Sequence, residues 1–136
     1  MKTLSLIFFF LAASLVSYSQ EMNLVGQWHL TNIKHVNKGE TNSMADEIRK
    51  GTFFLDFYFM QDGKFKQSGN AAGDGNVSTQ EGTWKLTGKK LIITIEYQGH
   101  QIDVDYVCEQ KGDSLVATRT SPNGEMSIIN EFVKVK

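Results

Sequence analysis

Residues 91–106 read LIITIEYQGHQIDVDY, in which apolar and polar residues alternate on both sides of Gln98-Gly99. A polar residue followed by glycine between two alternating runs is typical of a two-residue β-hairpin turn. The turn places mainly apolar residues opposite one another in four pairs, which are Tyr97 with His100, Ile95 with Ile102, Ile93 with Val104 and Leu91 with Tyr106. A slip of one residue would exchange the two faces of the sheet, so this pattern predicts both the hairpin and its register.

Turns at Gly88-Lys89 and Gln61–Gly63 continue the same apolar face into the neighbouring strands. The pairs that they predict are Leu86 with Leu91, Trp84 with Ile93, Gly82 with Ile95 and Phe59 with Phe65. Further along, an even-length loop around Lys111-Gly112 is expected to set Cys108 opposite Leu115. An even-length turn within residues 121–124 places Met126, Ile128, Asn130 and Phe132 on the same side as Leu115, Ala117 and Arg119.

Eight strands joined mostly by short turns are therefore expected. They are Leu24–Val36, Thr52–Met60, Lys64–Ser68, Thr79–Thr87, Lys90–Tyr97, His100–Gln110, Ser114–Thr120 and Glu125–Val135. One short helix is expected in the first connection, with Met44–Lys50 as its body, Asn42 or Ser43 as its N-cap and Gly51 as its stop. Closing such a sheet removes two exposed edges, so the predicted fold is an all-β, eight-stranded antiparallel up-and-down barrel.

The first residues of the 136-residue chain are typical of a removable secretory signal peptide. Lys2 precedes an apolar run, Leu4–Val16, and Ser17 and Ser19 supply small residues before the expected cleavage. The run is too short to span the ~30 Å hydrocarbon core of a bilayer, so no transmembrane segment is expected. The prediction is a signal peptide at residues 1–19 and one exported domain at residues 20–136, periplasmic or secreted.

Charge and cysteine content narrow the possible partners. The formal net charge is −1 with no basic run, which argues against a nucleic-acid partner. A single cysteine, Cys108, excludes an internal disulfide and is expected to lie inward as a small buried apolar residue. The three histidines have no spacing typical of a metal site. No cofactor and no catalytic group are predicted, because no histidine or carboxylate pair is placed to activate a nucleophile.

Gly26-Gln27-Trp28 on the first strand and Gly82-Thr83-Trp84 on the fourth resemble a motif of lipocalin-like proteins, in particular the short exported kind found in bacteria. A first connection of roughly 15 residues with a possible helix, followed by seven strands, adds to the similarity. The resemblance implies that Trp28 plugs the closed end of the barrel, with Lys134 or Lys136 packed over it. It also implies that a ligand enters at the opposite rim.

The residues expected to face inward near that rim are Phe53, Leu55, Gln67, Ile95, Tyr97, His100, Ile102, Ala117, Arg119 and Met126. An apolar wall with a few converging polar groups is typical of a small-molecule pocket. Arg119 would bind the acidic head of a lipid-like ligand, assisted by Tyr97 or His100. The alternative is an arginine at the rim that bridges to a loop acid such as Glu125 or Asp74.

Two functions remain open from the sequence. The first is an exported binding protein for a small hydrophobic or amphipathic ligand in the upper barrel. The second is a protein-interaction module, such as an inhibitor or a subunit of an envelope complex, whose barrel is filled by its own aromatic side chains. Phe54, Tyr58 and Met60, which are expected to point outward from one strand, could form the docking patch of the second or lie beneath the short helix.

Overall fold

Nine strands and one helix make up residues 22–70 and 75–136, the part of the chain that the computed structural model describes. The strands are β1 (Gly26–Asn37), β2 (Glu40–Ser43), β3 (Leu55–Phe59), β4 (Lys64–Gly69), β5 (Ser78–Thr87), β6 (Lys90–Tyr97), β7 (His100–Lys111), β8 (Ser114–Thr120) and β9 (Met126–Lys134), and the helix is α2 (Ala45–Arg49). The predicted signal peptide at residues 1–19 lies outside the described residues, as do residues 71–74 of the predicted Gly69–Asn76 loop.

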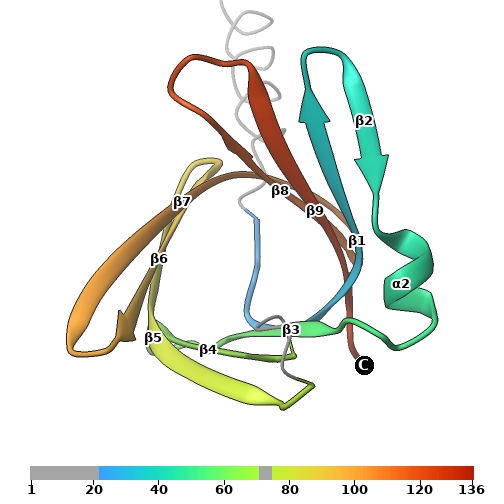
Figure 1. Cartoon of the computed structure of the whole chain (residues 1–136). Coiled ribbons are helices and arrows are strands. Elements are labelled where there is room, and N and C mark those ends of the chain that lie inside the picture. Colours follow the sequence, from blue (N-terminus) through green and yellow to red (C-terminus); the bar gives the residue numbers. More distant parts are fainter. Residues whose placement is uncertain (1–21, 71–74) are drawn as a thin grey trace, which may run out of the picture.

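The sheet closes on itself through β1, which has a neighbour on each side (Figure 1). Residues Gly26–His29 pair with β3, and Trp28–Asn37 pair with β9. Every pairing is antiparallel, and β3 to β9 follow one another in chain order. Within the described residues, β1 and β3–β9 form the closed, eight-stranded antiparallel barrel that the alternating sequence predicted.

A short additional strand, β2, was not predicted. It pairs with the far half of β1 through a two-residue turn in which Lys38 has φ +50° and Gly39 has φ +85°. The four residues of β2 are all polar and exposed, so the strand lacks the alternation of apolar and polar residues by which strands are recognised. Such a short strand can be recognised only from its pairing with β1 in the structure.

The short helix α2 begins slightly later than predicted. Met44 is its N-cap, and the expected caps Asn42 and Ser43 lie in β2. The hydroxyl of Ser43 donates a hydrogen bond to Asn32 Oδ1 at 2.8 Å and accepts one from the Ala45 N–H at 3.2 Å. This hydroxyl therefore ties the start of the helix to β1, while the N-cap residue itself, Met44, forms no side-chain cap hydrogen bond. Gly51, with φ +78°, follows the helix where its stop was expected.

The strand registers agree with the predicted hairpins in all but one case. The pairs predicted across β5–β6, β6–β7 and β3–β4 are all present, and the apolar residues of β8 and β9 share one side of the sheet as predicted. The exception is β7–β8, where Cys108 pairs with Ala117 rather than with Leu115. The turn there consists of Gly112 and Asp113, because Gly112 takes the positive φ of +58° at its first position. Because the register differs from the predicted one by two residues, the same side chains still face inward.

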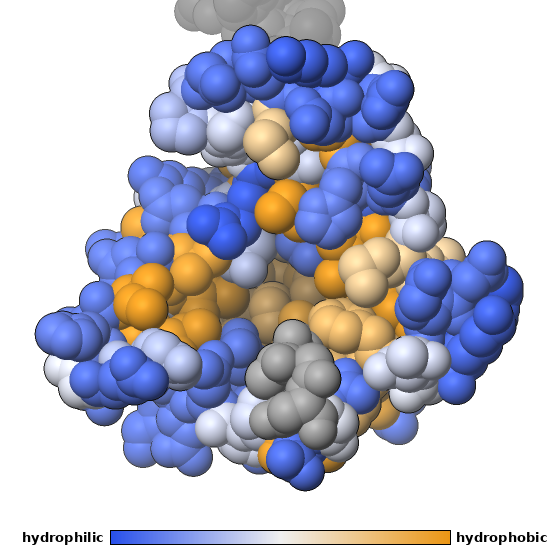
Figure 2. Space-filling model, in the orientation of Figure 1, coloured by the Kyte–Doolittle hydropathy of each residue, from blue (hydrophilic) through white to orange (hydrophobic). Residues whose placement is uncertain are grey.

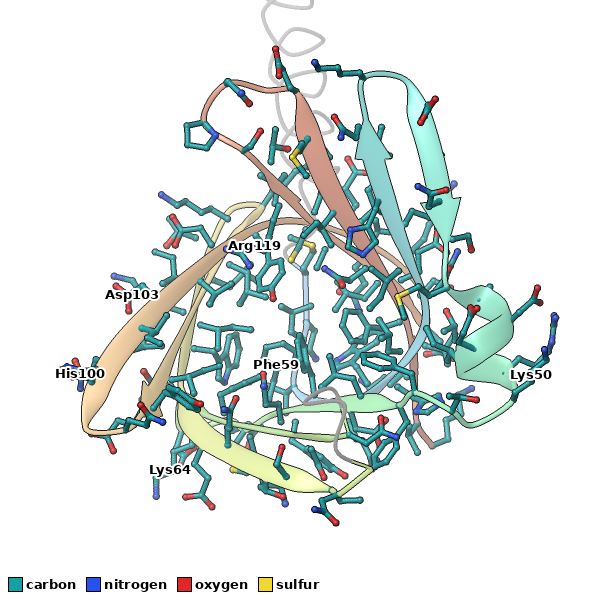
Figure 3. The ribbon with its side chains drawn as sticks, in the orientation of Figure 1. Lys50, Phe59, Lys64, His100, Asp103 and Arg119 are labelled. Carbon is teal, nitrogen blue, oxygen red and sulfur yellow. The ribbon has the colours of Figure 1, made fainter. Side chains whose placement is uncertain are left out.

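The core fills the closed half of the barrel. Trp28 is completely buried, and its indole N–H donates to the Leu24 carbonyl at 2.8 Å. Above it, Phe57 contacts the rings of three other phenylalanines, with the Phe132 ring centre 4.7 Å away. Figure 3 shows Phe59, another member of this cluster, in the middle of the barrel. The side chains that share this core at 4% exposure or less are Leu24, Trp28, Leu30, Phe57, Phe59, Phe65, Leu91, Ile93, Cys108, Leu115, Ala117 and Phe132.

Two inward glycines let neighbouring backbones approach closely. A Cβ at Gly82 would lie 1.8 Å from the Thr94 carbonyl oxygen, and one at Gly69 would lie 2.5 Å from the Phe54 carbonyl oxygen. Both distances are far below van der Waals contact, so only glycine fits at these positions without moving the backbone. The second Gly-X-Trp motif therefore begins with a glycine that the packing of β5 against β6 requires.

Candidate functional site

The end of the barrel opposite Trp28 is open. Among the connections that the structure describes in full, four come to this end, namely the β1–β2, α2–β3, β6–β7 and β8–β9 connections (Figure 1). Figure 2 looks into it and shows a central hollow whose wall is mainly hydrophobic, surrounded by a hydrophilic outer surface. The hollow lies above the aromatic core, so the space for a ligand is restricted to the upper barrel.

Three apolar side chains at inward positions near the open end of the barrel are exposed. Tyr97 is 50% exposed, Ile102 46% and Met126 49%. We call these three residues the mouth. Deeper on the same wall, Ile95 is half-buried between Gly82 and Ile102. Exposed apolar groups on an inner surface are available to a bound molecule, unlike those packed in the core.

The connection between α2 and β3 carries Phe53 to the same end of the barrel. Asn70 holds this connection in place, since its side-chain oxygen accepts from the Phe54 N–H at 2.8 Å and its amide donates to the Thr52 carbonyl at 3.0 Å. Phe53 and Leu55 are half-buried and pack against the core cluster from above. One side-chain amide thus positions the apolar segment that borders the hollow.

Two glutamines add neutral polar groups to the opposite wall. Gln67 on β4 and Gln80 on β5 are directly opposite each other, and the amide of Gln67 donates to the side-chain oxygen of Gln80 at 2.6 Å. Both are half-buried. Because each amide has more hydrogen-bonding capacity than this one bond uses, the pair offers a neutral polar contact inside an otherwise apolar wall.

Arg119 occupies an inward position of β8 near the open end of the barrel (Figure 3), and its side chain is exposed to solvent there. Its guanidinium carbon lies 5.9 Å from the centre of the Tyr106 ring, on the adjacent strand β7. Burial raises the pKa of Tyr106 above its ordinary value of 10.0, and this outweighs the opposing effect of the Arg119 charge. The phenol is therefore protonated at neutral pH and can donate a hydrogen bond.

The expected cluster of Arg119 with Tyr97 or His100 does not form. His100 lies at the tip of the β6–β7 hairpin, well away from Arg119 (Figure 3). Tyr97 pairs with His100 at that same tip. Ala117, also expected near the rim, is buried against Cys108 in the core below Arg119. Among the described residues Arg119 has no ion pair with Glu125, and Asp74 lies outside those residues.

Tyr106 was missed because of the β7–β8 turn. With the turn at Lys111-Gly112, Arg119 would lie opposite Val104. The observed register, in which Val107 pairs with Thr118, places Arg119 opposite Tyr106 at the next step. The position of Gly112 as the first turn residue was the available sequence signal.

Other reactive side chains are structurally engaged. Cys108 is fully buried, and burial raises the pKa of its thiol to about 12, so it is an inert thiol at neutral pH. On the outer face, His29 Nδ1 lies 2.5 Å from Asp56 Oδ1, and Gln27 donates to the other oxygen of the same carboxylate. In residues 22–70 and 75–136 no three His, Cys, Asp or Glu side chains are grouped so that they could hold a metal ion.

The outer face of β3 is mostly covered. The Lys66 ammonium lies 4.5 Å from the centre of the Tyr58 ring, and the Tyr58 hydroxyl accepts a hydrogen bond from Gln27. Phe54 is half-buried, and Met60 is 38% exposed. The short helix α2 packs against β1, so it is not the element that covers this strand.

Residues 24–117 match the family model described as a lipocalin-like domain. This chain belongs to the lipocalin-like domain family. The lipocalin-like barrel is similar to the crystal structure of a lipocalin-like protein from Bacteroides uniformis, with a TM-score of 0.56 and 18% sequence identity over 82% of this chain and 98% of that one. A variant of the fluorescent protein UnaG gives a TM-score of 0.46 at 14% identity, covering 83% of this chain and 96% of its own. No curated protein matches the sequence.

This lipocalin-like domain contains the lysine contact that the resemblance implied. Of the two candidates, Lys134 lies over the Trp28 ring, and Lys136 instead forms an ion pair with Asp113 at 3.0 Å. Across the described residues, the structure contains no helix with the length and hydrophobicity needed to cross a bilayer.

Proposed function

We propose that this lipocalin-like protein binds a small hydrophobic or amphipathic molecule in the upper barrel. The observation that carries the proposal is the hollow at the open end, whose wall is mainly hydrophobic (Figure 2). A concave, largely apolar site with a few polar groups is the usual form of a small-molecule pocket. The mouth residues and the Gln67–Gln80 pair supply those two kinds of contact.

Binding is proposed here without catalysis. The thiol of Cys108 is buried, and burial raises its pKa to about 12. The carboxylate of Asp56 and the imidazole of His29 face each other on the outside of the barrel, away from the hollow. The docking alternative has less support, because Lys66 covers the Tyr58 ring on the outer face of β3.

Export is part of the same proposal. A signal peptide at residues 1–19 would deliver the barrel to the periplasm or outside the cell, where it would meet its ligand. The composition of the segment supports this, since one basic residue precedes a short apolar run and small residues follow.

A fluorescence titration with the neutral apolar probe N-phenylnaphthylamine tests the proposed site. Ile102 and Val107 offer a matched pair on β7, because both are exposed and apolar but only Ile102 faces inward. We expect the wild-type protein to bind the probe saturably. Ile102→Gln should weaken the affinity about tenfold, because it removes ~1–2 kcal/mol of apolar contact. Val107→Gln should leave the affinity unchanged. Equal affinity in both variants, or no saturable binding, would remove the hollow as the site.

A further inference from the structure

The pairing between β7 and β8 covers only part of β7. This strand spans twelve residues, His100–Lys111, but only Val107–Lys111 pair with β8. Residues 100–106 pair with β6 on one side and, in the part of the chain that the structure describes, with no strand on the other. We call residues 100–106 the free edge of β7. Figure 1 shows the β6–β7 hairpin diverging there from the β8–β9 hairpin.

The backbone of the free edge points alternately toward β6 and away from it. Both residues of the β6–β7 turn have positive φ, as in a type I′ turn, so the pair that flanks the turn is hydrogen-bonded across the hairpin. By the antiparallel alternation, Gln101, Asp103 and Asp105 then direct their N–H and C=O groups away from β6. Cys108, three residues beyond Asp105, should face β6 again, and its N–H does donate to the Lys89 carbonyl at 2.7 Å.

The β8–β9 turn lies next to the free edge in the sheet, and its polar groups bond within the turn. The Gly124 N–H donates to the Ser121 carbonyl at 2.9 Å, and the Met126 N–H donates to the Ser121 hydroxyl at 3.1 Å. Among the described residues, the outward main-chain groups of the free edge are therefore available to a further strand. Such a row of unpaired N–H and C=O groups is what an added strand binds.

The outer face of the β6–β7 hairpin is acidic. Residues 91–106 contain three carboxylates, those of Glu96, Asp103 and Asp105, and no lysine or arginine. All three residues are exposed. Asp103 accepts a hydrogen bond from the Thr94 hydroxyl at 2.7 Å, and Asp105 lies 3.8 Å from the ammonium of Lys90, at the base of the hairpin. A negative charge thus lies directly beside the free edge.

The inner face of the same stretch is apolar. Ile102, Val104 and Tyr106 alternate with the polar residues, and Ile102 is 46% exposed. Figure 2 shows hydrophobic side chains gathered over this hairpin, on the side that faces the hollow. A strand added to the free edge would therefore meet carboxylates on one face and apolar side chains on the other.

We propose that the free edge binds an extended segment of a partner protein, which adds a strand antiparallel to β7 and alternates basic with apolar residues. Side chains directly opposite each other lie on one face of a sheet, and opposite charges there stabilise the pairing. Lysine or arginine opposite Asp103 and Asp105 would meet their carboxylates, and the apolar residues between them would pack beside Ile102. This inference does not depend on the proposed ligand site, and its surface is not the outer face of β3.

The same carboxylates disfavour a second copy of this chain as the occupant. Two free edges paired antiparallel over their full length would set Asp103 of one copy directly opposite Asp103 of the other. Sliding the pairing by two residues toward Tyr106 would set Asp103 opposite Asp105. Like charges directly opposite each other destabilise a sheet, whereas a basic segment meets no such repulsion.

Fluorescence anisotropy with labelled peptides tests the proposal on the purified protein. The probe has the core Lys-Val-Lys-Val-Lys, and its matched control has Glu-Val-Glu-Val-Glu. We expect the lysine peptide to bind saturably and the glutamate peptide to bind about tenfold or more weakly. The double substitution Asp103→Lys and Asp105→Lys should reverse this preference. Glu109→Lys makes the same charge change on β7 where β8 already covers the edge, so it should leave both affinities unchanged.

Main-chain pairing needs a separate readout, because charge alone could hold a basic peptide. Gln101→Pro removes an N–H that points away from β6 and changes no charge, so it should weaken the lysine peptide about tenfold while the melting temperature stays close to that of the wild type. N-methylation of the peptide's lysines should abolish binding, since their amides face the free edge, and N-methylation of its valines should be tolerated. Equal binding of the two methylated peptides would overturn strand addition.

The remaining outcomes are equally decisive. If neither peptide binds saturably, or if the lysine peptide binds the doubly substituted protein as well as the wild type, the proposed site is wrong. Sedimentation velocity should show a monomer. A dimer that Gln101→Pro dissociates would make a second copy the occupant and overturn the proposal. Binding of N-phenylnaphthylamine in the hollow is measured independently, so failure of the peptide site leaves the proposed function standing.

Discussion

The ammonium group of Lys134 lies 5.7 Å from the centre of the Trp28 ring and covers it at the closed end of the barrel. The lysine stem also faces Gly26, where an added Cβ would lie 3.1 Å from Lys134 Cε. Gly26 has φ +131°, a conformation that side chains rarely permit. Gly26 and Trp28 at the start of β1 and Lys134 at the end of β9 therefore close this end of the barrel together.

We expect Trp28→Ala to lower the free energy of unfolding by ~3–5 kcal/mol, because it removes a fully buried ring and leaves a cavity at the base. Lys134→Ala should cost less, ~1–2 kcal/mol, as the loss of a half-buried cation–π contact implies. Urea unfolding followed by far-UV circular dichroism measures both. Val107→Ala on the outer surface is the control, and a Trp28→Ala loss no larger than that of the control would contradict the closing role of Trp28.

Gly82→Ala tests the close approach of β5 and β6. The new Cβ would meet the Thr94 carbonyl oxygen, which is part of the backbone and cannot rotate away. We expect a loss at the upper end of the overpacking range, about 3 kcal/mol, or a failure to fold. Thr83→Ala, one residue along on the exposed outer face, should change stability much less. Wild-type melting temperature in Gly82→Ala would show that the two strands can separate at little cost.

Much of the fold could be predicted because its determinants are local in sequence. Gln98-Gly99 and the alternation around it specify one hairpin. Each further turn adds a strand, and its register follows because a slip of one residue would turn its apolar side chains outward. The β7–β8 turn was misplaced because Lys111-Gly112 and Gly112-Asp113 both resemble a turn, and the inner face is the same for either. β2 was missed because its four polar residues carry no periodic signal.

The candidate site could be predicted only in outline. Alternation placed Arg119 on the inner face, but its neighbour on β7 depended on a register two residues away from the expected one. The side chain of Asn70 holds the α2–β3 connection through hydrogen bonds to Phe54 and Thr52, which lie 16 and 18 positions away in the sequence. Contacts of this kind arise only when separate strands meet, so no short segment of sequence contains them.

The thiol of Cys108 predicts a pH dependence of stability. Its pKa is raised to about 12 in the native state, whereas an exposed cysteine titrates near ~8.5. The unfolded chain thus loses this proton first as the pH rises, so the free energy of unfolding falls between about pH 9 and pH 12. Cys108→Ala should have a shallower decline, by up to ~1.4 kcal/mol per pH unit, in urea unfolding over this range. Parallel curves for the two proteins would contradict the raised pKa.

The predicted signal peptide can be tested by mass spectrometry of the exported protein. We expect a mature chain that begins at Gln20, because Ser17 and Ser19 supply the small side chains that a signal peptidase accepts. Ser19→Arg should leave the precursor uncleaved, whereas Ser14→Ala should be processed normally. An intact N-terminus in the wild-type protein would remove the prediction of export.

Apart from Ile48 of α2 and residues that flank the strands, the most deeply buried side chains lie below Arg119, while the mouth is built from partly exposed ones. Folding thus depends chiefly on one end of the molecule and recognition on the other. Exchanging Tyr97, Ile102 or Met126 would change the choice of ligand at little cost to stability. Substitutions in the mouth could therefore change ligand specificity during evolution while the core at the closed end stays the same. For the same reason the mouth is the region in which to engineer new specificities.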